Sequence, residues 1–197
     1  IGANLTLDGA AINQAMNFES AVTLAGAALE NIVLTSNGLA GSDIVLQSSL
    51  ADTANETITF NAGAAGDVDV TGTVDVGTGD VLITNAFNVD FRNTVDADQF
   101  DQTNGVGTTV FADTITLGGT FDWDGNNLTI NGANNDIGGN FTADIEDNGG
   151  VLTFGNAAVT NIEGSLTQTQ TGNGVVGGVT IGANLTLDGA AINQAMN

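Results

Sequence analysis

The chain has 197 residues, of which 23 are Asp or Glu and one is basic, so its formal net charge is −22; His, Cys and Pro are absent. General acid–base catalysis near neutral pH usually uses His, Schiff-base chemistry needs Lys and thiol chemistry needs Cys, and none of the three occurs. With Arg92 as the only basic residue, the phosphate contacts that bind nucleic acid and the attraction to an anionic membrane are excluded as well.

The opening segment, IGANLTLDGAAINQAMN at 1–17, recurs unchanged at 181–197. An identical match of this length does not arise by chance. The sequence therefore predicts a tandem array. Residues 1–180 are one full unit, 181–197 begin the next, and 1–17 mark the unit boundary.

Short segments in which apolar residues alternate with Thr or Asp follow one another along the chain. They include LTL at 5–7, VTL at 22–24, ITF at 58–60, VDV at 68–70, ITL at 115–117, FDW at 121–123, LTI at 128–130 and VTI at 179–181. This period of two predicts half-buried strands. The Ala-rich segment 10–32 is also predicted to form strands. The strand-like triplets at 22–24 and 32–34 interrupt the spacing of apolar residues that one face of a helix would need.

Clusters of Gly, Asn and Asp separate the predicted strands. They lie at 37–43, 61–67, 77–80, 124–127, 147–150 and 171–174. These residue types tolerate positive φ, so they predict tight corners.

The spacing of the strands selects among the all-β architectures. Sandwiches and barrels use longer strands joined by hairpins, whereas apolar cores of about three residues suit a solenoid, in which each coil pairs with the coils above and below it. Hydrophobic residues make up 42% of the chain, enough to fill a core, and no apolar run is long enough to cross a bilayer. We therefore predict an all-β, parallel β-solenoid (a right-handed β-helix) with about nine coils per unit, at about 20 residues per coil.

In such a solenoid each coil buries a row of apolar side chains against its neighbours. The free energy of folding is then close to a sum of the contributions of the interfaces between coils. The predicted buried row includes Leu5, Leu7, Phe121, Trp123, Leu128 and Ile130. Asn and Thr at recurring positions are expected to form ladders between coils. The absence of Pro fits, because a central strand cannot lose its N–H donor.

The segments at 4–14, 91–123 and 164–174 resemble the degenerate repeats of giant secreted bacterial proteins, namely the filamentous-haemagglutinin-like and autotransporter-type adhesins. The resemblance covers nearly the whole chain. It implies a stalk, fibre or surface layer, extracellular or at the cell surface, with adhesive or structural duties.

Calcium is the cofactor that the acidic segments favour, since it prefers Asp and carbonyl oxygens. The candidate metal ligands are Asp67, Asp69, Asp75 and Asp80 in one segment, and Asp122, Asp124 and Asn126 in another. Neither segment matches a strict calcium loop. The alternative interpretation is that strand Asp residues face water and turn Asp residues shape the corners. Arg92 is expected to pair with Asp90 or with a carboxylate of the next coil.

These observations favour a non-catalytic structural repeat that forms a rod, fibre, stalk or sheath at a bacterial surface. Its expected partners are neighbouring units, other copies of the same fibre and divalent cations, without nucleic acid or membrane insertion. One alternative is a calcium-dependent surface-layer or adhesion repeat. A remote alternative is a polysaccharide-active β-helix enzyme. In that enzyme the ring of Trp123 would be the platform for a sugar, and the carboxylates of Asp122 and Asp124 would flank it.

Overall fold

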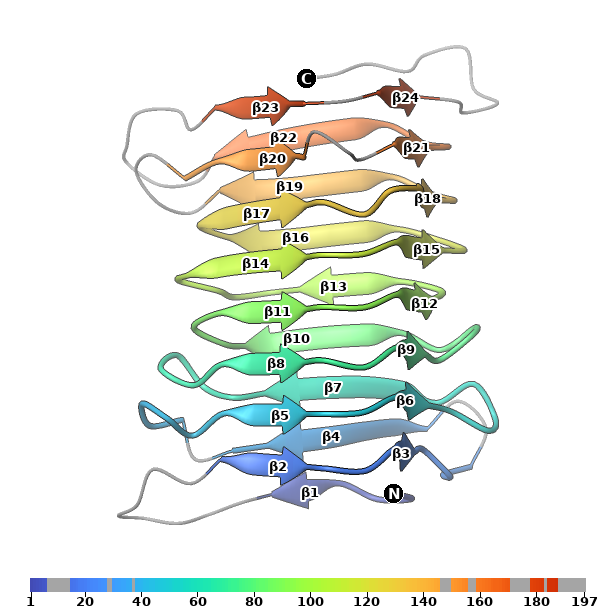
Figure 1. The fold of residues 1–197 in the computed structure, drawn as a ribbon, viewed down its shortest axis with the longest axis vertical. Coiled ribbons are helices and arrows are strands. Elements are labelled where there is room, and N and C mark those ends of the chain that lie inside the picture. Colours follow the sequence, from blue (N-terminus) through green and yellow to red (C-terminus); the bar gives the residue numbers. More distant parts are fainter. Residues whose placement is uncertain are drawn as a thin grey trace.

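The computed structural model describes residues 1–6, 15–27, 30–36, 38–145, 150–155, 159–170, 178–182 and 184–187. These residues form three parallel sheets of eight strands each, here named A, B and C, and the chain visits one strand of each sheet per coil. Figure 1 shows the coils stacked along the long axis, with the first and the last strand at opposite ends of the stack. The predicted all-β parallel β-solenoid is confirmed; its right-handed winding stays a prediction.

The strands of each sheet follow the chain in steps of three. Sheet A consists of β1 (Leu5–Thr6), β4 (Asn31–Thr35), β7 (Thr57–Asn61), β10 (Val81–Asn85), β13 (Phe100–Gln102), β16 (Phe121–Gly125), β19 (Phe141–Ile145) and β22 (Leu166–Gln170). Sheet B consists of β2 (Met16–Phe18), β5 (Ile44–Leu46), β8 (Val68–Val70), β11 (Val89–Phe91), β14 (Thr108–Phe111), β17 (Asn127–Ile130), β20 (Leu152–Phe154) and β23 (Val179–Ile181). Sheet C consists of β3 (Val22–Thr23), β6 (Leu50–Ala51), β9 (Val74–Asp75), β12 (Val95–Ala97), β15 (Ile115–Leu117), β18 (Asn135–Ile137), β21 (Thr160–Ile162) and β24 (Leu185–Leu187).

The predicted count of about nine coils is too high. Each sheet has eight strands, so there are eight coils, of which the six between the two terminal ones have a neighbour on both sides. The prediction assumed about 20 residues per coil throughout. Coil length in fact varies: the coil from Asn31 of β4 to Thr57 of β7 is longer than the coil from Val81 of β10 to Phe100 of β13. Coils longer than about 20 residues account for the difference, and they occur early in the chain, from Asn31 to Thr57, and again near its end, from Phe141 to Leu166.

Alternation of buried and exposed side chains along most strands separates the core from the surface. In β16, Phe121 and Trp123 are buried while Asp122 between them is exposed. Leu128 and Ile130 are buried as predicted, whereas Leu5 is 38% exposed at the end of the stack and Leu7 lies outside the described residues. Six phenylalanines form a continuous column through the core, with neighbouring ring centroids 4.5 to 6.1 Å apart: Phe91, Phe100, Phe111, Phe121, Phe141 and Phe154.

The predicted corners and polar ladders are also present. Gly38, Gly41, Gly63 and Gly77 have positive φ between 56° and 76°, and they lie in the predicted clusters at 37–43, 61–67 and 77–80. The outward threonines Thr129, Thr153 and Thr180 are in register on adjacent strands of sheet B. Within 10–32, the described part contains strands β2 and β3, as predicted. In the part of the chain that the structure describes, no helix is long and apolar enough to cross a membrane.

Candidate functional site

The outer face of sheet A carries an acidic groove of about 280 Å³ over β13, β16, β19 and β22. In-register pairing places Asp101 of β13 opposite Asp122 of β16, and Asp124 of β16 opposite Asp144 of β19. The groove is lined by Asp101, Gln102, Thr103, Asp122, Trp123, Asp124, Thr142, Asp144 and Thr169. Because neighbouring strands lie about 4.8 Å apart, each pair brings two carboxylates together on one face.

Buried polar side chains support this groove from beneath. The indole nitrogen of Trp123 donates a hydrogen bond to Thr109 Oγ1 (3.0 Å), and the Thr109 hydroxyl donates to Gln102 Oε1 (2.8 Å). Gln102 Nε2 donates to the carbonyl oxygen of Asp124 (3.2 Å). Each side chain in this series of hydrogen bonds holds the next one in place, so the backbone that carries the outward Asp124 is anchored to the buried core. Trp123 is only 1% exposed, so its ring packs in the core and offers no flat face to a sugar.

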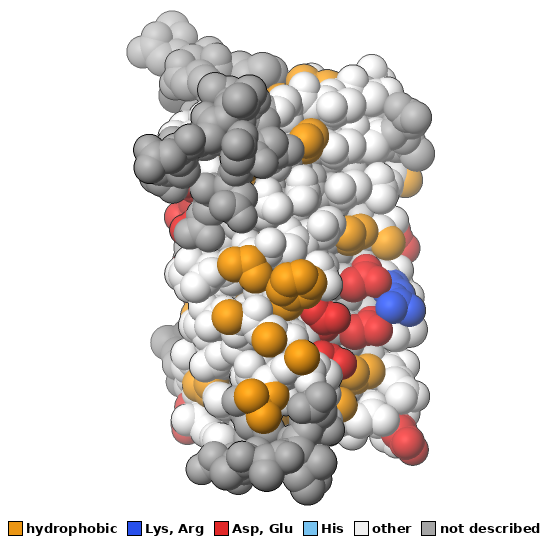
Figure 2. Space-filling view, turned by 90° about the vertical axis from the view of Figure 1, so that its left-hand side faces the viewer, with side chains coloured by type: hydrophobic (Ala, Val, Ile, Leu, Met, Phe, Trp, Pro, Cys, Tyr) orange, Lys and Arg blue, Asp and Glu red, His pale blue; other side chains and the backbone are white. Residues whose placement is uncertain are grey.

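Carboxylates stack on the other two sheets as well. Asp75 lies opposite Asp96 on sheet C, and Asp69 lies opposite Asp90 on sheet B. Like charges on neighbouring strands repel each other. On sheet B the repulsion is relieved by Arg92, whose Nη2 lies 2.9 Å from Asp69 Oδ2 and whose Nε lies 2.8 Å from Asp90 Oδ2. The predicted pairing of Arg92 is confirmed, and Figure 2 shows its blue side chain against a red acidic patch.

Burial and neighbouring charges perturb the pKa of three of these stacked carboxylates, Asp69, Asp96 and Asp101. Burial raises the pKa of Asp101, and the negative charges of Asp122 and Asp80 raise it further. The pKa of Asp96 is raised by burial and by the charge of Asp75. Burial also raises the pKa of Asp69, partly offset by the positive charge of Arg92. Ionising Asp69, Asp96 and Asp101 therefore costs the folded chain free energy.

Stability is expected to increase as the pH falls from neutral to about 4. The pKa of Asp96 and of Asp101 is higher in the folded chain than the ordinary Asp value of 3.8, so the folded state binds more protons in this range, and the added stability is lost as the pH rises through the folded pKa. Urea unfolding at several pH values measures this trend. Asp101→Asn should flatten it and raise stability near neutral pH.

A matched control separates this effect from a general acid response. The buried Glu56 accepts backbone N–H bonds from Thr53 (3.2 Å) and Ala54 (2.9 Å). Burial by itself raises the pKa of Glu56, but these bonds outweigh burial and the pKa is lowered. Glu56→Gln should therefore lower stability near neutral pH, the opposite sign to Asp101→Asn. A stability that rises with pH in the parent chain would contradict the role of the ladders.

The structure distributes the predicted calcium ligands over several faces. Asp69 lies on sheet B, Asp75 on sheet C and Asp80 at the corner before β10. Asp67 shapes a corner: its Oδ1 accepts the backbone N–H of Asn88 in the next coil (2.9 Å), and its own N–H donates to Asp43 Oδ1 (2.9 Å). The structural interpretation of turn Asp residues thus holds at Asp67.

The second predicted set stays closer together. Asp122 and Asp124 share the sheet A groove, while Asn126 lies just beyond β16, at the corner to sheet B. Among the described residues, no group of three or more His, Cys, Asp or Glu side chains is placed to hold a metal ion. Calcium binding therefore stays a prediction.

Sequence reasoning missed the stacking partners Asp96, Asp101 and Asp144. A signal for Asp101 is present in the sequence, because Phe100–Asp101–Gln102 and Phe121–Asp122–Trp123 share the order aromatic, Asp, large side chain. Aligning every such triplet on its sheet would have paired them.

A strip of exposed apolar side chains runs along the corners between sheets A and B. It contains Leu39, Phe87 and Val106, which are 42 to 45% exposed. Figure 2 faces this edge of the molecule and shows apolar side chains gathered along it beside the acidic patch.

Comparison of the chain with protein-family models, with curated proteins and with solved structures finds no match.

Proposed function

We propose that this chain is a non-catalytic structural repeat of a giant extracellular protein, which forms a rod, fibre, stalk or sheath at a bacterial surface. The observation that carries the proposal is an unbroken parallel ladder through eight coils, combined with the identity of the segments 1–17 and 181–197. A solenoid adds length with each unit, because every unit contacts only its neighbours. The resemblance to filamentous-haemagglutinin-like and autotransporter-type repeats supports the same role.

The charge distribution supports a surface role. Residues 18–197 contain 22 acidic residues (23 less Asp8) and Arg92, so each added unit carries a net charge of −21. Such a charge keeps long rods soluble and apart. The strip formed by Leu39, Phe87 and Val106 gives each rod one edge that other copies of the same fibre can contact. Neighbouring units are the principal partners in this proposal.

Small-angle scattering of longer chains tests the proposed rod. Proteins with two and four copies of the unit should share one cross-section and differ in length, by about 38 Å per added unit at about 4.8 Å per coil. The cross-section serves as the internal control, because it stays constant only if the coils continue in one stack. Compact particles for both proteins would refute the rod.

The second candidate function is a calcium-dependent surface-layer or adhesion repeat. The stacked pairs Asp101–Asp122 and Asp124–Asp144 favour it, because a divalent cation between two carboxylates relieves their repulsion. Calcium should then raise the thermal midpoint, and a chelator should lower it again. Asp122→Asn should reduce the response, while Asp136→Asn on sheet C serves as the matched control. No change in midpoint with calcium or chelator would rule this candidate out.

A further inference from the structure

The first residues of the two identical segments, described at 1–6 and at 181–182 and 184–187, lie at different corners of the solenoid. In the first copy, the Ile1 nitrogen donates to the Thr23 carbonyl (2.6 Å) and the Ala25 N–H donates to the Ile1 carbonyl (2.9 Å). These bonds place Ile1 opposite Leu24, at the end of sheet C. Leu5 of the same segment pairs with Leu34 in sheet A. The first copy therefore turns the corner from sheet C to sheet A.

The second copy instead turns the corner from sheet B to sheet C. Ile181 pairs with Phe154 in sheet B, and Leu185 pairs with Thr160 in sheet C. The two corners are not equivalent, because they lead into strands of different length. Most strands of sheet A are five residues long, whereas the strands of sheet C have two or three residues. One sequence cannot fit both corners equally well in a continuous array.

We propose that in the tandem array both copies turn the corner from sheet C to sheet A, so that one unit is eight whole coils. This inference rests on the tandem continuation in the proposed function. The segment 137–144, IGGNFTAD, shares five of eight positions with IGANLTLD at 181–188. It turns from sheet C to sheet A, since Ile137 ends β18 and Phe141 begins β19. A close internal relative of the repeated segment thus lies at the proposed corner.

Coil lengths agree with this register. If Leu185 begins a sheet A strand, the coil from Leu166 to Leu185 has the same length as the coil from Val81 to Phe100. Leu5 and Leu185 are the same position in successive units, so one unit then spans eight coils. In the structure of this chain the two segments are instead seven and two-thirds coils apart, because β1 lies in sheet A of the first coil and β24 in sheet C of the eighth.

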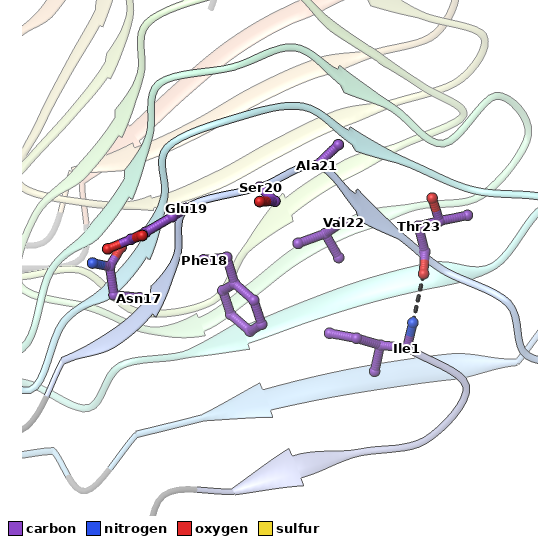
Figure 3. A pocket seen from close by; sticks show the side chains of 8 residues that line it. All are labelled: Ile1, Asn17, Phe18, Glu19, Ser20, Ala21, Val22 and Thr23. Atoms are coloured by element: carbon purple, nitrogen blue, oxygen red, sulfur yellow. Dashed lines mark hydrogen bonds between the residues drawn. The ribbon is translucent and has the colours of Figure 1, made fainter.

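The first coil carries a cavity where the preceding unit would dock. The cavity has a volume of about 480 Å³ and is lined by Ile1 and by residues 17–23. Figure 3 shows the side chains of Ile1, Phe18 and Val22 around this space. Since Ile1 lies opposite Leu24, the two residues that precede it in the array fall opposite Val22 and Thr23.

Those two residues would be copies of Val179 and Thr180. Val179 is 37% exposed on the last coil of this chain, and Phe18 is only partly buried on the first. Joining two units places the Val179 side chain over Val22 and beside Phe18, while Thr180 faces outward beside Thr23. The proposed occupant of the cavity is therefore the segment Gly178–Thr180 of the preceding unit.

Engineered disulfides test the register directly, because the chain has no cysteine. In a two-unit protein, Thr180→Cys should cross-link with Thr23→Cys of the following unit. The alternative pair, Thr180→Cys with Thr153→Cys, corresponds to the register of the present structure. Adjacent parallel strands bring both pairs within disulfide range when they are in register. We expect the first pair to oxidise at least about tenfold faster than the second, measured by mass spectrometry under mild oxidation.

Each outcome has a definite consequence. Faster oxidation of the pair with Thr153, or of neither pair, overturns the eight-coil register. Small-angle scattering of the same two-unit protein separates a wrong register from a wrong proposed function. An elongated particle would still support the rod, whereas a compact particle would refute it. Thr23 and Thr180 are exposed, so the cysteines leave the core unchanged, and the single Thr180→Cys protein serves as the control.

Discussion

Phe121→Ala should lower the free energy of unfolding by about 3–5 kcal/mol. Phe121 is fully buried between Phe100 and Phe141 in adjacent coils, with ring centroids 5.0 and 4.5 Å away. The Phe121 and Phe141 rings are stacked with an interplanar angle of 1°. Removing the ring loses its burial and leaves a cavity that regular coils cannot close, because the backbone ladders fix their spacing.

Phe87→Ala is the matched control for this substitution. It removes the same ring from a corner between sheets A and B, where Phe87 is 45% exposed. The expected change is within about 0.5 kcal/mol. Urea unfolding followed by circular dichroism measures both proteins. Equal losses for the two substitutions would show that the aromatic column does not hold the coils together.

The sequence predicted the architecture because burial in a solenoid alternates along each strand. Triplets such as Phe121–Asp122–Trp123 show which side chain faces inward without any knowledge of the neighbouring coil. The number of coils depends instead on corner length, which varies from coil to coil. The corner from Asp52 to Thr57, for example, is longer than the equivalent corner from Ala97 to Phe100. Apolar spacing carries little information about such insertions, so the predicted coil count was too high.

The candidate site was harder to predict for the same reason. Asp122 and Asp124 were identified in one segment, but their partners Asp101 and Asp144 lie a full coil earlier and a full coil later in the chain. Which carboxylates stack depends on register, and register depends on every corner between them. The four acidic residues in 67–80 were grouped because they are close in sequence. In the fold, successive strands belong to different sheets, so residues that are close along the chain lie on different faces.

Ala112→Pro should lower the free energy of unfolding by about 2–3 kcal/mol. The Ala112 N–H donates to the carbonyl of the buried Phe91 in the preceding coil (2.8 Å). The same bond recurs in other coils, from Arg92 to Val70 (2.9 Å) and from Asn131 to Phe111 (2.8 Å). Proline removes the donor and leaves a buried carbonyl without its partner.

Ala112→Ser is the control, because the Ala112 side chain is exposed and serine keeps the N–H donor. Its expected effect is within about 0.5 kcal/mol. The residue before the proline is already extended as the last residue of β14, so the substitution adds little strain there and reports mainly on the lost bond. Urea unfolding of the two variants gives the difference. If proline were tolerated as well as serine, the backbone ladder would contribute little to stability, and the absence of proline from the chain would need another cause.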